Sequence, residues 1–261
     1  MSSFARRAVL AFGCKAAEDT GLDDTGVDVC PVPYGEGERT VRGRAYFFTM
    51  PTLGQIELVT DVMGAEVYVV EAPELRVTLQ SSDAFAFAFD GLPDDCDVTL
   101  AAVHDDFFPH MTATWRVGGE DLEGLTFQSI SNELVALTTG VYDVDSDDDT
   151  VCHMAATVTA IHQSQDTVWA VGEPGATVTI EPAVDEEQGP FYFNEMVLPD
   201  VTLSETTTDG GVIVIGADPG TYHWTGHKEG LAFRPLKMRC EGGWLTNASP
   251  PWGMQAEDLE R

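Results

Sequence analysis

Basic side chains are scarce in this sequence. The 261 residues include 13 lysines and arginines against 44 aspartates and glutamates, and the formal net charge is −31 at pH 7. Such a chain repels phosphate backbones and anionic lipid head groups. We therefore expect no binding to nucleic acid. The acidity is typical of a solvated surface in an extracellular or salty setting, and attraction of a cationic partner is the alternative.

Long apolar runs and local catalytic motifs are also missing. After residue 14 no stretch reaches 18 uninterrupted apolar residues, so we expect no membrane-spanning helix. The sequence has no Gly-x-Ser-x-Gly, no phosphate-binding loop, no dinucleotide-binding glycine pattern and no His-Glu-x-x-His. Because catalytic groups can assemble from distant residues, this evidence is modest. It favours a non-catalytic protein without a metal or another cofactor.

An internal repeat is present instead. The clearest copies are Ser81 to Val98 and Thr206 to Trp224, in which an Asp turn, a β-rich run and a Gly- and Pro-containing turn follow in order. We expect a hairpin in each copy. Five pairs of identical residues share one separation, 199 − 73 = 126: Pro73 and Pro199, Asp83 and Asp209, Pro93 and Pro219, Phe107 and Phe233, and Pro109 and Pro235. A repeat of about half the chain predicts two domains.

The strand patterns indicate an all-β fold. Leu75, Val77 and Leu79 alternate with polar residues, and Phe85, Phe87 and Phe89 alternate with alanines, which is the period of a strand with one face in the core. In the second copy Ile213 and Ile215 take the places of Phe87 and Phe89 and preserve this inward face. A single helical turn is expected at Leu134 to Leu137. We predict two tandem antiparallel β-sandwich domains, at 30–141 and 151–261, separated by an acidic linker at 142–150.

The N-terminus resembles a bacterial lipoprotein signal. Arg6 and Arg7 precede a short apolar run from Ala8 to Phe12, and Gly13 and Cys14 follow. The resemblance implies lipidation of Cys14, export, and a flexible acidic tether up to residue 29. The mature protein would then be a lipoprotein of the outer membrane or of a cell surface or periplasmic face, held to the membrane by its lipid only. The alternative is a frayed cytosolic N-terminus with an incidental cysteine.

The other four cysteines are Cys30, Cys96, Cys152 and Cys240. None belongs to a Cys-x-x-Cys pair, so neither a zinc knuckle nor a thioredoxin-like motif is supported, and an exported chain would oxidise them. Four cysteines allow three pairings. Cys30 and Cys152 each precede the first strand of a repeat, whereas Cys96 and Cys240 lie inside successive repeats. The simplest pairing is therefore Cys30 with Cys96 and Cys152 with Cys240.

An insertion distinguishes the second copy from the first. The strand at Gly175 matches Gly64 at a separation of 111, which later becomes 126, so 126 − 111 = 15 residues are inserted before Pro199. The insertion carries Phe191, Tyr192 and Phe193 beside acidic residues. We expect this segment to contact a partner. The alternative is that the three rings cap an open end of the second core.

The paired motifs resemble the carboxypeptidase regulatory-like, or transthyretin-like, β-sandwich family. They are GAEV followed by SSDAFAFAFDGLP, and GATV followed by TTTDGGVIVIGADPG, over residues 40–115 and 155–240. This resemblance implies a fold more than a function. Within that fold the intradiol dioxygenases bind iron, and GPFYF is similar to their Gly-Pro-Tyr site. Their His-x-His pair is absent, and alternation puts Tyr222 on the opposite strand face from His223 and His227.

Two functions follow from these observations. The first is a non-catalytic, envelope-anchored binding or structural module, whose partner is an envelope protein, a peptide or a glycan. The second is a metal-dependent enzyme of the dioxygenase-like sandwich type.

Overall fold

The computed structural model describes residues 30–52, 55–59, 63–80, 86–160, 171–248 and 253–257. The predicted signal, the tether and Cys14 lie outside these residues. The elements of the first half are β1 (Arg39–Thr52), β2 (Gln55–Val59), β3 (Glu66–Val69), β4 (Ala72–Thr78), β5 (Ala86–Leu92), β6 (Cys96–Val98), β7 (Leu100–His104), β8 (Phe107–Met111), β9 (Trp115–Val117), β10 (Leu122–Ile130) and α1 (Asn132–Gly140). Those of the second half are β11 (Cys152–Thr159), β12 (Thr177–Glu181), β13 (Phe191–Phe193), β14 (Pro199–Asp200), β15 (Gly211–Ala217), β16 (Gly220–His227), β17 (Ala232–Phe233), β18 (Leu236–Cys240), β19 (Leu245–Ala248) and β20 (Met254–Glu257).

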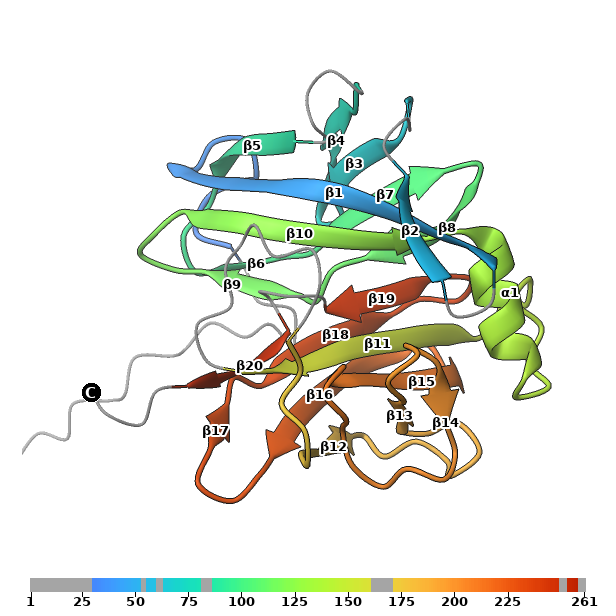
Figure 1. The fold of residues 1–261 in the computed structure, drawn as a ribbon. Helices are drawn as coiled ribbons and strands as arrows, with labels where there is room; N and C mark the ends of the chain where they lie inside the picture. The colour runs from blue at the N-terminus through green and yellow to red at the C-terminus, as the bar shows by residue number, and fades with distance from the viewer. Residues whose placement is uncertain are drawn as a thin grey trace, which may run out of the picture.

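The predicted all-β class is confirmed, and the sheets are stacked in a sandwich-like arrangement (Figure 1). One sheet follows the order β10-β1-β2 with β5 on β1, and a large sheet follows β14-β13-β15-β11-β19-β8-β7-β3-β4. Smaller sheets contain β12-β16-β18 and β6-β9. Most neighbouring strands are antiparallel, as expected. In addition, β10 pairs with β1, and β19 with both β11 and β8, in parallel.

The sequence repeat is also a repeat of strand topology. In the first half β1 lies between antiparallel β5 and parallel β10. In the second half β11 lies between antiparallel β15 and parallel β19. The pair of β3 with β7 likewise matches that of β12 with β16. Each copy of the sequence therefore builds the same central arrangement around its first strand.

The expected hairpins are not formed. β15 pairs with β11 and β13, whereas the next strand, β16, pairs with β12 and β18. In the first half β5 pairs with β1 and β6 with β9. The turn in each copy thus carries the chain from one sheet to another. In the second copy Gly216, at φ +73°, lies in this corner against Val144, a conformation that favours glycine.

The inward face predicted for the second copy is also wrong. β15 is buried on both faces, and it is Val212 and Val214 that belong to the main core cluster. Ile213 points to the other side of the sheet, where it lines a pocket. The alternation of a strand does not identify its core face when both faces are covered.

The two halves share one sheet and one hydrophobic core. β19 of the second half pairs with β8 of the first, and residues of both halves form a continuous core cluster. On another face Lys237 Nζ lies 2.5 Å from Asp97 Oδ2, and the Thr114 amide donates to the Lys237 carbonyl at 2.8 Å. The segment that was expected as a linker, 142–150, also contacts the second half. Its Tyr142 stacks on Phe191, with 4.4 Å between the ring centroids.

Two disulfides have the pairing that the sequence favoured. Cys30 is joined to Cys96 and Cys152 to Cys240, with Cα–Cα distances of 5.5 and 5.6 Å. The first ties the segment before β1 to β6. The second ties β11 to β18 and so links two sheets, and each half carries its own disulfide.

The helix α1 extends over Asn132–Gly140, beyond the single turn expected. Ser131 caps it, since its Oγ accepts a hydrogen bond from the Leu134 amide at 3.3 Å. Val135 packs with Phe108 of β8 and Leu245 of β19 in a small separate cluster, so the helix covers the junction between the halves. Among the helices of the described residues, none is both long and apolar enough to span a membrane.

Candidate ligand pocket

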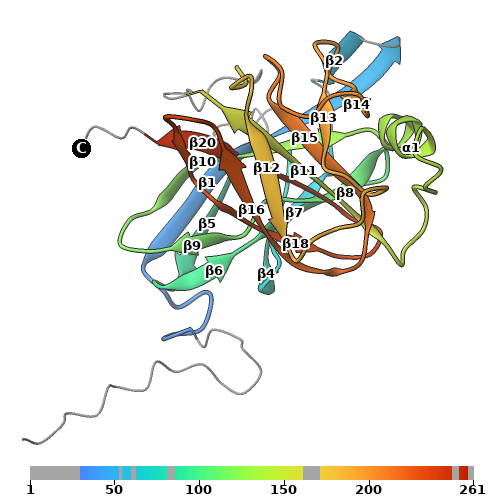
Figure 2. The same cartoon turned by 90° about the horizontal axis from the view of Figure 1, so that it is seen from below.

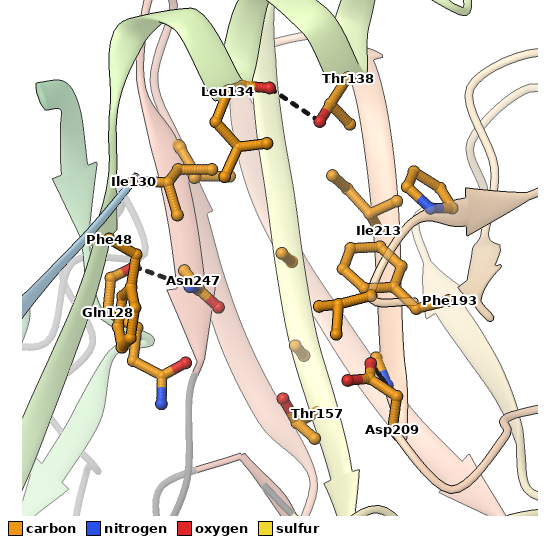
Figure 3. Close-up of a pocket in the computed structure, with 16 residues that line it drawn as sticks. Phe48, Gln128, Ile130, Leu134, Thr138, Thr157, Phe193, Asp209, Ile213 and Asn247 are labelled. Atoms are coloured by element: carbon orange, nitrogen blue, oxygen red, sulfur yellow. Dashed lines mark hydrogen bonds between the residues drawn. The ribbon is translucent and has the colours of Figure 1, made fainter. Parts of the chain in front are cut away.

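A pocket of about 300 Å³ lies over the junction between the halves (Figure 3). Its floor is made by β11, β15 and β19 of the large sheet. One wall comes from β1, β10 and α1, and the opposite wall comes from the inserted segment around β13 and β14. In Figures 1 and 2, α1 and the β13–β14 pair lie toward the same end of the molecule. The pocket is thus built from both halves and from the insertion.

The floor is hollow because its central side chains are small. Ala155 of β11 lies between Ile213 of β15 and Asn247 of β19 in the strand register. One step along the same face, Thr157 lies opposite Gly211. Residues two apart on a strand share a face, so this row points into the pocket.

The wall from the first half is apolar at Phe48, Ile130 and Leu134. Phe48 and Leu134 are almost completely buried, and Ile130 is partly buried beside them. The hydroxyl of Thr138 donates to the Leu134 carbonyl at 2.9 Å, which satisfies this polar group within the helix. The Asn247 side chain donates to the Gln128 carbonyl at 3.1 Å and so ties the floor to this wall across the two halves.

Phe193 forms the opposite wall. A Cβ atom placed on Gly211 would lie 2.7 Å from Phe193 Cδ2, so glycine at this position leaves room for the ring. The Thr207 hydroxyl donates to the Phe193 carbonyl at 2.8 Å and holds the strand in place. Val197 and Pro199 continue the apolar wall beyond the ring.

Asp209 is the acidic group of the pocket. Its Oδ1 accepts a hydrogen bond from the Gly211 amide at 3.0 Å. Burial raises the pKa of Asp209, and the bond from Gly211 offsets part of this rise. Within the part of the chain that the structure describes, no lysine, arginine or histidine forms an ion pair with this carboxylate. The sequence identified Asp209 only as a turn residue, because its role depends on neighbours from other strands.

The three aromatics predicted to contact a partner have three different environments. Tyr192 is 5% exposed, and its hydroxyl oxygen accepts a hydrogen bond from the Val178 amide at 3.0 Å. The expectation of a contact role is therefore wrong for Tyr192, because alternation turns its ring into the core. Phe191 stacks on Tyr142, and Phe193 lines the pocket. The capping alternative thus describes Tyr192, and Phe193 stays a candidate for contact.

The residues weighed for a metal site do not converge. Tyr222 is buried, and its hydroxyl donates to the Asp218 carbonyl at 2.8 Å. His223 and His227 lie on the exposed face of the same strand, where His227 Nε2 is 2.8 Å from Thr179 Oγ1. Within the described ranges, no group of three His, Cys, Asp or Glu side chains is arranged to hold a metal ion. The geometry offers no support for the dioxygenase alternative.

No protein-family model and no curated protein matches this chain. Several solved structures resemble it weakly. GBS52, the minor pilin of Streptococcus agalactiae, is 9% identical with a TM-score of 0.27, over 86% of this chain and 98% of that one. The Bacillus anthracis TIE protein is 10% identical with a TM-score of 0.23, over 84% of this chain and 34% of that one, so this chain spans about a third of its length.

The shaft pilin SpaA of Lactobacillus rhamnosus GG is 8% identical with a TM-score of 0.22, over 85% of this chain and 100% of that one. These identities and TM-scores are too low to transfer a function from those proteins to this chain.

Proposed function

We propose that this protein is a non-catalytic binding module of the cell envelope, and that it holds its ligand in the pocket between its halves. The observation that carries this proposal is the pocket itself. Its volume of about 300 Å³ is at the lower end of the range for ligand sites, and apolar walls with a few polar groups are typical of such sites. Because the pocket lies over the β8–β19 junction, strands of both halves hold its floor and walls in place.

Two properties support a location outside the cytoplasm. Both disulfides lie in the folded part of the chain, and disulfides persist in oxidising compartments. The net charge of −31 suits a solvated extracellular surface. We also propose that the chain is an exported lipoprotein, anchored through Cys14. Its two carboxypeptidase regulatory-like halves, 30–141 and 151–261, share one sheet, and its partner is an envelope protein or peptide.

Selection from a random peptide library tests the binding proposal. We expect peptides selected on the purified chain to lose most of their affinity for the variant Ala155→Leu, because the larger side chain fills the floor of the pocket. Thermal unfolding of the variant checks that it still folds. Selected peptides that bind both proteins equally, or a failure to select any peptide, would contradict the proposal.

The anchor has a separate test. The intact mass of membrane-extracted protein should correspond to a chain that begins at a lipidated Cys14. Recovery of an unmodified chain that still begins at Met1 would exclude both the anchor and this route of export.

A further inference from the structure

We propose that the pocket recognises a peptide segment carrying a lysine, with the ammonium of that lysine at Asp209 and apolar neighbours along the floor and walls. This inference rests on the proposed binding function and specifies its ligand. It predicts that the pocket prefers a lysine-containing peptide to an uncharged one, a preference that an apolar pocket without Asp209 would not have.

The first argument is the position and state of Asp209. Figure 3 shows its carboxylate near Thr157, at the end of the pocket away from Leu134 and Thr138 of α1. The Gly211 amide is the donor that the structure places on it, at 3.0 Å. One neutral hydrogen bond compensates only part of the desolvation of a carboxylate. A cationic group from a ligand would supply the missing compensation.

The second argument is the apolar path that leads to this carboxylate. Ile213 is 6% exposed and Leu245 3%, and with Phe193 they form a continuous apolar lining. A lysine side chain has an aliphatic stem that packs on apolar surface and a charged end that needs a polar partner. An apolar trough with a carboxylate at its end matches both parts of this side chain.

The third argument distinguishes a peptide from a free small amine. Apolar surface continues beyond the pocket on both walls. Met196 in the inserted segment is 59% exposed, beside the lining residue Val197, and Val201, which follows the insertion, is 68% exposed two residues after the lining residue Pro199. On the helix side Leu137 is 47% exposed. A small amine would leave this apolar rim uncovered, whereas the side chains that flank a lysine in a peptide would cover it.

The net charge of the whole chain also favours a cationic ligand. With 44 acidic and 13 basic residues the molecule attracts cationic segments from a distance, and this attraction is screened by salt. Long-range attraction raises association rates for any basic peptide. The contact at Asp209 is therefore the part that distinguishes a lysine in the pocket from a positive charge elsewhere.

Three matched peptides test the inference. They are Ac-Leu-Val-Xaa-Val-Leu-NH₂ with lysine, norleucine or glutamate at Xaa, so that the aliphatic stem stays similar while the charge changes. Affinities are measured by calorimetry on the purified chain at 0.15 M salt. We expect the lysine peptide to bind about tenfold more tightly than the norleucine peptide, as for a partly exposed charged hydrogen bond, and the glutamate peptide to bind most weakly.

Two variants separate the contact from general attraction. Asp209→Asn keeps the acceptor for Gly211 and removes the charge, and we expect it to bring the lysine and norleucine peptides within about twofold of each other. Glu74→Gln, on the exposed part of β4 at the opposite end of the large sheet from β14, removes the same charge away from the pocket and should retain the tenfold preference.

The outcomes separate this inference from the proposed function. Equal binding of all three peptides, lost in Ala155→Leu, would overturn the lysine preference and leave the binding site in place. No binding, or binding that Ala155→Leu does not change, would overturn both. n-Pentylamine that binds as tightly as the lysine peptide would show that the site takes a free amine and would overturn the assignment to a peptide.

Discussion

The two halves of this molecule use the same central strand arrangement and fill it differently. In the first half the middle row across β10, β1 and β5 faces the hydrophobic core. In the second half the corresponding row across β19, β11 and β15 lines the pocket. The two rows are Leu125, Gly43 and Phe87 in the first half, and Asn247, Ala155 and Ile213 in the second.

The side chains of these rows explain the difference. Phe87 is 5% exposed and packs edge-on against Phe127, with 5.6 Å between ring centroids, and a Cβ on Gly43 would collide with the Phe87 ring. Ile213 has no aromatic ring to replace the volume of Phe87, and Asn247 replaces a leucine. A repeated scaffold thus has a closed core on this face in one copy and an open pocket in the other. Ile213 and Asn247 fill less apolar volume than Phe87 and Leu125, and different neighbours cover the two rows.

The largest expected effects come from the disulfides, which both halves possess. Replacing Cys30 and Cys96 by Ala, or Cys152 and Cys240 by Ala, should lower the free energy of unfolding by roughly 4 kcal/mol each, because the sequence separations of 66 and 88 constrain the unfolded chain to a similar degree. Urea unfolding of each double variant measures this. A loss below about 1 kcal/mol for either pair would show that the bridge does not constrain the unfolded state.

The next prediction concerns Tyr192, the central aromatic residue of the insertion that only the second half has. Tyr192→Ala should lower the free energy of unfolding by roughly 3 to 5 kcal/mol, because it leaves a cavity in the core. Tyr192→Phe removes only the acceptor for the Val178 amide and should cost about 1 kcal/mol. Urea unfolding of both variants gives the values. Unchanged stability of Tyr192→Ala would return this ring to the surface role that the sequence indicated.

The junction between the halves should be sensitive to acid. His110 of β8 and His153 of β11 both pair with Leu245 of β19, and burial lowers the pKa of His110 to about 3 and that of His153 to about 4. Both lie below the ordinary histidine pKa of about 6.5, so the unfolded chain binds protons that the folded chain does not. Stability is therefore lost as the pH falls from about 6.5 toward 4.

A variant isolates the contribution of one histidine to this loss. His110→Gln should reduce the loss of unfolding free energy between pH 7 and pH 4.5 by on the order of 2 kcal/mol relative to the native chain. Urea unfolding at both pH values measures the difference, and comparison of the two proteins removes the common contribution of the carboxylates. An identical pH dependence of the two proteins would mean that His110 has the same pKa in the folded and the unfolded chain.

Exchanging one residue between the rows tests the comparison of the halves directly. Phe87→Ile should lower the free energy of unfolding by about 2 kcal/mol, because it opens a cavity in a closed core. Ile213→Phe should cost less than about 1 kcal/mol, because the ring can enter the pocket, and it should abolish peptide binding. Chemical unfolding and calorimetry provide the two readouts. Equal losses of unfolding free energy in the two variants would show that the two rows are packed equally tightly.

Much of the fold was predictable because it depends on local patterns and on the repeat. Alternating residues located β4 and β5 correctly, and the matching segments at Gly64 and Gly175 located β3 and β12. The position of each cysteine relative to its repeat indicated the bridges that the structure contains. The helix α1 was placed correctly and predicted too short, since its Ser131 cap extends a helix that packing on Phe108 and Leu245 stabilises. Phe193 was identified from the insertion, but neither Asp209 nor Asn247 was recognised as part of a site.

The sequence by itself determined the all-β class, the twofold repeat and the acidic composition, because these follow from composition, alternation and spacing along the chain. It favoured one of three cysteine pairings, and the structure has that pairing. Only the tertiary structure decided that the turns carry the chain between sheets, that β19 joins the halves through β8, and that Ile213 faces a pocket. The physical reason is that a strand buried on both faces has no polar side to report its orientation. Its neighbours, which come from distant parts of the chain, determine which face lies in the core and which face remains open to a ligand.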